Sequence, residues 1–106
     1  MMIIAFASKN HLGLNSDIGS DIVNSEYITV AEVEDGKLKK VKNVENIFYN
    51  DQKLNAKDFV DFISKTNAEI FVVMNISEEI KAELLKNNIS VKLVTLGRIA
   101  DILKSF

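Results

Sequence analysis

The stretch that decides the fold is residues 70–94, which read IFVVMNISEEIKAELLKNNISVKLV. Residues 70–74 form a short apolar run, typical of a strand buried on both faces of a sheet. Residues 78–86 place Ile80 and Leu84 on one helical face, and two asparagines then end the helix. Residues 90–94 predict a second strand. A strand, a helix and a strand in this order predict a βαβ unit with parallel strands.

The rest of the chain supplies the partners of this unit. Residues 2–7 predict a nearly continuous apolar strand, and residues 27–34 and 37–44 predict a hairpin closed by Asp35-Gly36. Helical spacing of apolar residues recurs at 54–66 and 97–106. With the first strand in the centre, the mixed five-stranded sheet has the order 3-2-1-4-5 with strand 2 antiparallel. We therefore expect an α/β protein, a three-layer α/β/α sandwich with a ribonuclease-H-like motif.

Composition limits the classes of function. The 106 residues predict a single domain spanning 1–106, with 47% hydrophobic and 26% charged residues. The net charge of −2 gives no general attraction to nucleic acid or anionic membranes, so we expect neither as a partner. Without cysteine, the chain supplies neither disulfides nor thiolate ligands for metal clusters. No apolar run is long enough to span a membrane, and the first apolar run has no basic region before it and no credible cleavage site, so we expect a cytoplasmic protein.

Four lysines lie in the predicted strand 37–44, at positions 37, 39, 40 and 42. They could contact a phosphate backbone, but no aromatic platform accompanies them. Pairing with Glu32 and Glu34 across the hairpin, together with protection of a sheet edge, is a sufficient explanation.

The predicted strand order creates a crevice where the chain leaves the first and fourth strands in opposite directions. Open α/β sheets bind ligands at such a point. The long loop 8–21 and the turn 75–77 border this crevice. The start of the helix at residue 78 favours anions, although Glu78 and Glu79 partly cancel this effect. We predict ligand contacts from the following residues: Asn10, His11, Asp21, Asn75 and Ser77.

Three of these residues, His11, Asp21 and Ser77, also have a simpler interpretation. His11 is the only histidine, and an exposed loop position explains it better than a ligand role. Asp17 and Asp21 could form a carboxylate pair, but acids and glycines are also common in loops. Ser77 has the position of a helix N-cap. No pattern of a nucleophile, a base and an acid is present, so we predict no catalytic residues, and the sequence leaves any metal ligand unknown.

Several segments resemble the dinitrogenase iron–molybdenum cofactor biosynthesis family. These segments are residues 3–8, Leu14-Asn15-Ser16, the strand and hairpin 27–37, and residues 68–73 with the turn 74–77. The resemblance covers almost the whole chain. It implies a small ribonuclease-H-like domain that carries or inserts metal-cluster precursors of nitrogenase. By this resemblance alone, the cargo would be an iron–molybdenum or iron–sulfur cluster precursor and the partners cofactor-assembly proteins.

The chain departs from the family where ligands are expected. With Tyr27 in register, the family's histidine, aromatic residue, glycine and arginine fall on residues 21–24, which read DIVN. Met74 and Ser77 stand where the turn usually has glycines, and Leu54-Asn55-Ala56 replaces a glycine-rich loop.

The combined expectation is a non-enzymatic binding or carrier protein for a metal cluster or a small anion. The alternative is a protein-interaction module that has lost its ligand. A metal-dependent hydrolase or nuclease is disfavoured, since the first strand contains no carboxylate. The oligomeric state is left open.

Overall fold

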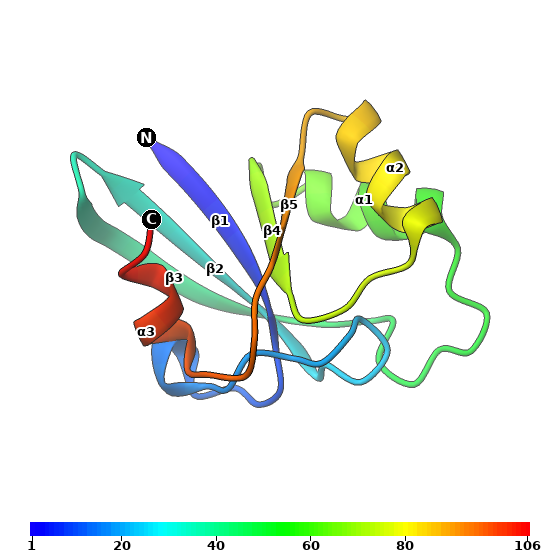
Figure 1. The fold of residues 1–106 in the computed structure, drawn as a ribbon, viewed down its shortest axis with the longest axis horizontal. Helices are drawn as coiled ribbons and strands as arrows, with labels where there is room; N and C mark the ends of the chain where they lie inside the picture. Colours follow the sequence, from blue (N-terminus) through cyan, green and yellow to red (C-terminus); the bar gives the residue numbers. More distant parts are fainter.

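A five-stranded mixed sheet forms the centre of the protein, and the computed structural model describes all of residues 1–106. The strands lie in the predicted order β3-β2-β1-β4-β5, and helices cover both faces (Figure 1). The three-layer α/β/α architecture is thereby confirmed. The strands are β1 (Met2–Ser8), β2 (Tyr27–Glu34), β3 (Lys37–Glu45), β4 (Ile70–Val73) and β5 (Ser90–Leu93). The helices are α1 (Ala56–Ser64), α2 (Glu78–Lys86) and α3 (Ile99–Leu103), and a 3-10 turn spans Gly13–Asn15.

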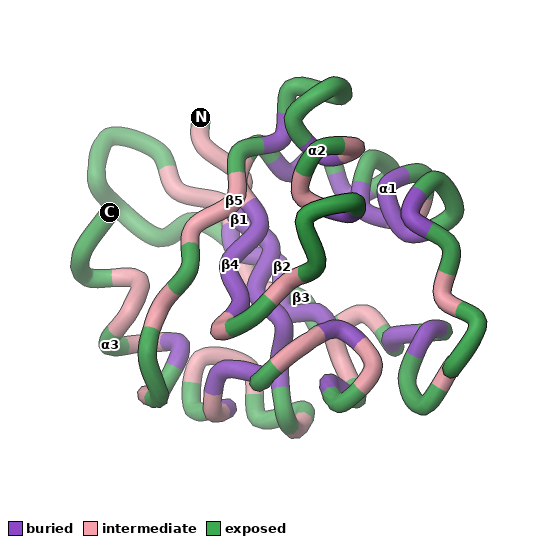
Figure 2. Tube along the Cα trace, turned by 45° about the vertical axis from the view of Figure 1, so that its right-hand side comes forward, coloured by how far each residue is buried: buried purple, intermediate pink, exposed green.

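Strand β1 is the central strand of the sheet. It pairs antiparallel with β2, where Ile4 lies opposite Ala31, and parallel with β4, where Ile4 lies opposite Ile70. Residues 4–8 are completely buried, as the tube in Figure 2 shows for the centre of the sheet. Burial on both faces explains why this strand is almost continuously apolar in sequence.

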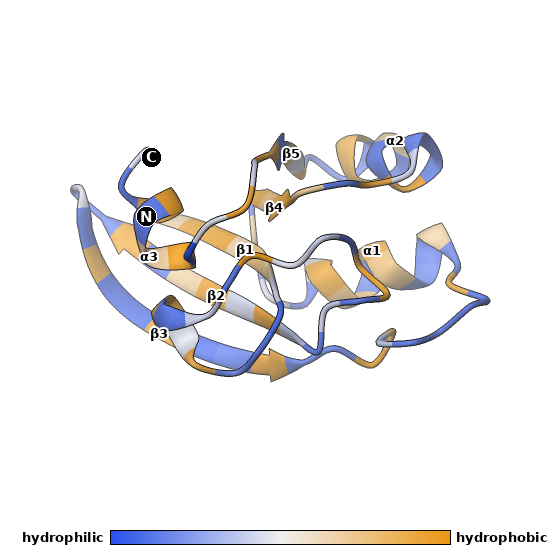
Figure 3. Cartoon of the chain, turned by 60° about the horizontal axis from the view of Figure 1, so that its bottom comes forward, coloured by the Kyte–Doolittle hydropathy of each residue, from blue (hydrophilic) through white to orange (hydrophobic).

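The β2–β3 hairpin closes with Asp35 at φ 53° and Gly36 at φ 75°. Two consecutive positive φ values are those of a type I′ turn, whose twist matches that of the flanking strands. Strand β3 forms the sheet edge and is mostly hydrophilic in Figure 3. Lys40 lies opposite Glu32 and Lys37 opposite Glu34, but no lysine of β3 lies within 4.0 Å of a carboxylate. Edge protection therefore explains these lysines better than cross-strand ion pairs.

Helices α1 and α2 cover one face of the sheet and enclose the larger core of 16 buried residues. Phe59 of α1 packs edge-on against Phe71 of β4, with ring centroids 5.3 Å apart. Helix α1 is shorter than the predicted range 54–66. Asn55 caps its start by accepting a hydrogen bond from the backbone N–H of Asp58, and Asn67 follows its end with a positive φ of 63°.

Helix α3 covers the opposite face with a smaller core of six buried residues. The prediction of a helix over 97–106 is wrong at both ends, because α3 contains only Ile99–Leu103. At its start, the carbonyl of Gly97 accepts a hydrogen bond from the N–H of Ile18, and the N–H of Ile99 donates to the carbonyl of Ser16. These two bonds keep residues 97–98 extended. No helix of the protein has the length and apolar character needed to cross a membrane.

Candidate functional site

Residues 19–21, here called the strap, cross the carboxyl ends of the two central strands. The N–H of Gly19 donates to the carbonyl of Ala7 at the end of β1, at 2.8 Å. The carbonyls of Gly19 and Ser20 accept from the N–H groups of Met74 and Asn75 after β4, at 3.3 and 2.9 Å. The predicted crevice at this edge is therefore spanned by a segment of the chain itself, which leaves a hollow on either side.

The first hollow, here called the Asp21 hollow, has a volume of about 200 Å³. Three of the predicted contact residues, Asp21, Asn75 and Ser77, line it together. Its other lining residues are apolar: Ile22, Val23, Leu54, Ile76 and Ile80. Asp21, Glu78 and Glu79 make its charged surroundings negative, which disfavours an anion at this position.

The second hollow, here called the Lys9 hollow, has a volume of about 410 Å³. Its lining combines one cation and two hydrogen-bonding side chains with three apolar ones: Lys9, Ser20, Asn24, Ile18, Met74 and Leu96. Lys9 follows β1 and Met74 follows β4, so this hollow occupies the predicted switch point of the sheet. A lysine with neighbouring hydroxyl and amide donors is suited to a small anion.

The polar residues around the strap are held by hydrogen bonds. Oδ1 of Asp21 accepts from the backbone N–H and the side-chain amide of Asn24, at 3.0 and 2.8 Å. Nδ2 of Asn75 lies 3.4 Å from the carbonyl of Ser20. Asp21 and Asn75 thus position Asn24 and Ser20, which both line the Lys9 hollow.

Ser77 acts as the N-cap of α2. Its Oγ accepts from the backbone N–H of Ile80 at 3.2 Å, as the position before Glu78-Glu79 predicts. This role occupies one acceptor site of the hydroxyl, and Ser77 also lines the Asp21 hollow.

Asn10 and His11 line neither hollow. The carbonyl of Asn10 accepts from Ser8 and Ser16, and its Oδ1 accepts from the N–H of Asp17 at 3.3 Å, so this residue organises the first loop. The His11 ring lies against Tyr27, with centroids 5.1 Å apart and an angle of 32° between the planes. The structure therefore separates these two predicted contacts from the other three.

Direct ligation of a metal by side chains has little support in this geometry. No three histidine, aspartate or glutamate side chains come close enough together to hold a metal ion. His11 is the only imidazole, and the chain has no thiolate.

Sequence reasoning missed several residues of the Lys9 hollow. Ser20, Asn24 and Leu96 gave no signal, since no motif marks them and Leu96 is far away in sequence. Lys9 was identifiable as a neighbour of the first strand, because the residue after a central strand lies at the switch point.

A family described as dinitrogenase iron-molybdenum cofactor matches the chain over residues 1–106. No curated protein sequence matches it. The fold is similar to the crystal structure of PH0822, with 25% identity, a TM-score of 0.84, and coverage of 99% of this chain and 89% of the other.

Two further solved structures share the fold at lower sequence identity. The apo form of the orange protein from Desulfovibrio gigas has 14% identity and a TM-score of 0.83, and the similarity covers 100% of this chain and 87% of that one. A Thermotoga protein of the DUF35 family has 20% identity and a TM-score of 0.79, with the same coverage of 100% and 87%. At these identities the similarity supports the fold alone.

Proposed function

The chain belongs to the dinitrogenase iron-molybdenum cofactor family, and from this membership we propose that it is a non-enzymatic binding protein for a small anionic ligand. The ligand binds beside the strap, in the Lys9 hollow. The observation that carries this proposal is the position of Lys9, Ser20 and Asn24 around one hollow at the carboxyl ends of β1 and β4.

Electrostatics favours the Lys9 hollow over the Asp21 hollow for an anion. Lys9 is the only charged residue that lines the Lys9 hollow, and Asp21 is the only charged residue that lines the Asp21 hollow. The side chains at the Asp21 hollow act indirectly, because Asp21 fixes Asn24 and Asn75 fixes Ser20. Loss of either bond would let the strap shift and would weaken binding without removing a direct contact.

The family description suggests a cargo related to the iron–molybdenum cofactor. Clusters and oxyanions of this kind are anionic, and Lys9 with two neighbouring polar side chains would hold them by charge and hydrogen bonding. Delivery to cofactor-assembly proteins is the role that follows for such a carrier, and these proteins are its proposed partners.

A non-enzymatic role accords with how the polar side chains are used. Oδ1 of Asp21 accepts two hydrogen bonds from Asn24, and the His11 ring packs on Tyr27. The second candidate function is an interaction module that has lost its ligand. It is favoured by one observation: Asp21, Asn75 and Ser77 each already make a hydrogen bond within the chain.

Anaerobic incubation with iron and sulfide, followed by desalting, tests the carrier proposal. Retained iron and a charge-transfer absorption band are expected for the wild-type protein. Equilibrium dialysis against molybdate tests the simpler anion in parallel. Lys9→Gln should retain less of either, whereas Lys57→Gln, an equal charge change on the exposed surface of α1, should bind like the wild type.

Three outcomes would contradict the proposal. Wild-type protein that retains neither iron nor molybdate would favour the interaction module, especially if native mass spectrometry shows a defined complex. Equal binding by Lys9→Gln and the wild type would exclude the Lys9 hollow. Turnover of a phosphodiester with Mg²⁺ or Mn²⁺ that disappears in Asp21→Asn would indicate an enzyme.

A further inference from the structure

A separate apolar cavity of about 350 Å³ lies between α3 and the β2–β3 hairpin. None of its lining residues borders the two hollows at the strap. Six of its eight lining residues are hydrophobic, and its walls come from the β2–β3 hairpin, the 3-10 turn and α3. Its principal side chains are Leu14, Val33, Leu38, Leu103, Lys104 and Phe106. We propose that this α3 cavity binds a small amphipathic molecule with an apolar body and an anionic head group. The proposal is independent of the ligand at the strap.

The cavity exists because α3 covers only part of its face of the sheet. Helix α3 has five residues, while β2 and β3 have eight and nine. The hairpin therefore extends beyond the helix, on the left of Figure 1. Leu38 and Phe106 line the cavity but remain 43% and 37% exposed, so apolar surface faces water there. A ligand that buried this surface would gain hydrophobic free energy.

The size and lining of the cavity match those of small-molecule sites. Ligand pockets typically have volumes of about 300 to 1,000 Å³ and mainly hydrophobic walls with a few polar groups. A further hollow, lined by Met1, Met2 and Asp35, continues from the α3 cavity, since Val33, Gly36 and Phe106 border both. Gly36 lies on this shared border, and no atom lies within 4 Å of the position that its Cβ would take. An extended apolar tail therefore has room beyond the first cavity.

The charge at the cavity indicates the head group. Lys104 is the only charged residue of its lining. The partner of Lys104 is Asp101 at 3.9 Å, and both side chains are more than 70% exposed, so this ion pair is weak. A carboxylate or sulfonate on the ligand can therefore approach the Lys104 ammonium group.

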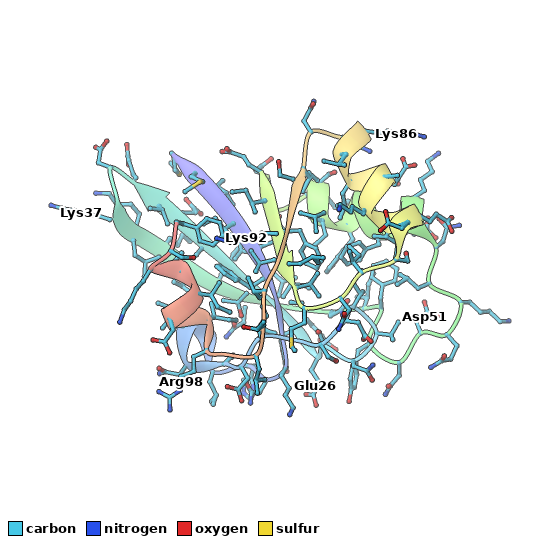
Figure 4. All side chains as sticks on the ribbon, in the orientation of Figure 1. Glu26, Lys37, Asp51, Lys86, Lys92 and Arg98 are labelled. Carbon is cyan, nitrogen blue, oxygen red and sulfur yellow. The ribbon has the colours of Figure 1, made fainter.

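A second lysine, Lys92, lies against a residue of the cavity wall. Nζ of Lys92 lies 4.2 Å from the centroid of the Phe106 ring and donates to Oγ of Ser105 at 3.2 Å. Figure 4 shows Lys92 pointing from β5 toward the α3 side. Phe106 also packs edge-on against Phe6, with centroids 6.2 Å apart. Phe106 thus lines the cavity while it contacts Lys92 and Phe6.

Binding of the anionic fluorophore anilinonaphthalene sulfonate to the intact protein tests the proposal. We expect saturable, blue-shifted fluorescence that decanoate displaces. Leu38→Glu places a carboxylate in the cavity wall and should weaken binding about tenfold, since burying an unpaired charge costs at least about 1.4 kcal/mol. Leu85→Glu is the matched control, because Leu85 is an exposed leucine of α2 outside the cavity.

A neutral probe separates the head-group contact from the apolar contact. Lys104→Gln should weaken the sulfonate by about threefold, as expected for an exposed ion pair. It should leave the uncharged analogue phenylnaphthylamine unaffected. Ala100→Phe fills the cavity from α3 with an apolar side chain and should abolish binding of both probes, while far-ultraviolet circular dichroism shows a folded protein.

The proposal is overturned if folded Leu38→Glu and Leu85→Glu bind the sulfonate equally, or if the wild type shows no saturable binding. If Lys104→Gln changes the binding of the sulfonate and of the uncharged analogue equally, the proposal of an anionic head group at Lys104 is wrong. If sedimentation shows a wild-type dimer that Leu38→Glu converts to a monomer, the cavity is covered by a second copy of the chain instead.

Discussion

Gly19 and Ser25 are packed so closely that a methyl group on Gly19 would overlap the Oγ atom of Ser25. The same methyl group would lie 3.2 Å from Cβ of Ala7, a fully buried residue of β1. Gly19 also forms backbone hydrogen bonds to both central strands, through Ala7 and Met74. Only glycine therefore lets the strap lie against the sheet at this distance.

Substitution Gly19→Ala should destabilise the protein by about 2 kcal/mol, the usual cost of an extra methyl group in a packed site. The measurement is urea unfolding followed by circular dichroism. Removing the obstructing side chain should recover part of this loss, so Gly19→Ala combined with Ser25→Gly should cost less than the sum of the single changes.

Gly97→Ala is the control for this pair. No atom lies within 4 Å of the position that its Cβ would take. The change should alter stability by less than about 0.5 kcal/mol. Equal losses for Gly19→Ala and Gly97→Ala would show that the close approach at the strap does not determine stability.

Among the buried polar residues outside the helices, Asn46 should contribute most to the stability of the protein. Its Nδ2 donates to the carbonyls of Ile22 and Ser25 at 2.9 and 2.7 Å, and its Oδ1 accepts from the N–H of Phe48 at 3.0 Å. Asn46→Ala leaves three buried backbone groups without these partners and should cost about 2 to 4 kcal/mol.

Thermal and urea unfolding measure this loss. Asn87→Ala serves as the comparison, because Asn87 is exposed and its amide makes one hydrogen bond, to Glu83. That change should cost less than about 1 kcal/mol. Similar losses of unfolding free energy in Asn46→Ala and Asn87→Ala would show that the burial of Asn46 does not determine its contribution.

The caps of the two longer helices should be equivalent in energy. Asn55 accepts from Asp58 N–H and Ser77 accepts from Ile80 N–H, both at 3.2 Å. Asn55→Ala and Ser77→Ala should each lower the free energy of unfolding by about 1 kcal/mol. A Ser77→Asp variant should retain stability if the cap alone matters, and a loss as large as in Ser77→Ala would indicate repulsion by Glu78 and Glu79.

The lysines of β3 should affect association more than stability. Because they form no ion pairs, Lys40→Thr combined with Lys42→Thr should change the free energy of unfolding by less than about 1 kcal/mol. Light scattering should nevertheless show faster aggregation, since the edge strand loses its charge. Lys81→Thr with Lys86→Thr on α2 removes the same charge away from the edge and should aggregate like the wild type.

The sequence allowed the topology to be predicted because its elements have different apolar periods. Strand β1 and strand β4 are continuous apolar runs, whereas α2 repeats at helical spacing between two clear stops. The bounds of α2 and β2 were predicted to the residue. The end of the chain was predicted less well, because the extended pairing of residues 97–98 with the first loop depends on contacts that no local pattern records.

The candidate site was predictable in position but not in composition. Strand order alone located it at the carboxyl ends of β1 and β4. The backbone of Gly19 and Ser20 occupies this position, because its carbonyls accept hydrogen bonds from residues more than fifty positions later in the chain. Backbone pairing of this kind leaves no trace in the spacing of side chains. Asn10 and His11 line neither hollow, whereas the other three predicted residues line the Asp21 hollow.

The central place of β1 also sets the order in which the protein can assemble during synthesis. Residues 2–8 leave the ribosome before the β2–β3 hairpin and can pair with β2 as soon as the hairpin emerges. Their second neighbour, β4, is made much later in the chain. Until then the nascent half-sheet exposes the apolar edge of its most hydrophobic strand, an interval in which aggregation competes with folding. Conditions that slow translation between residues 45 and 70 should therefore lengthen the period in which a chaperone is needed.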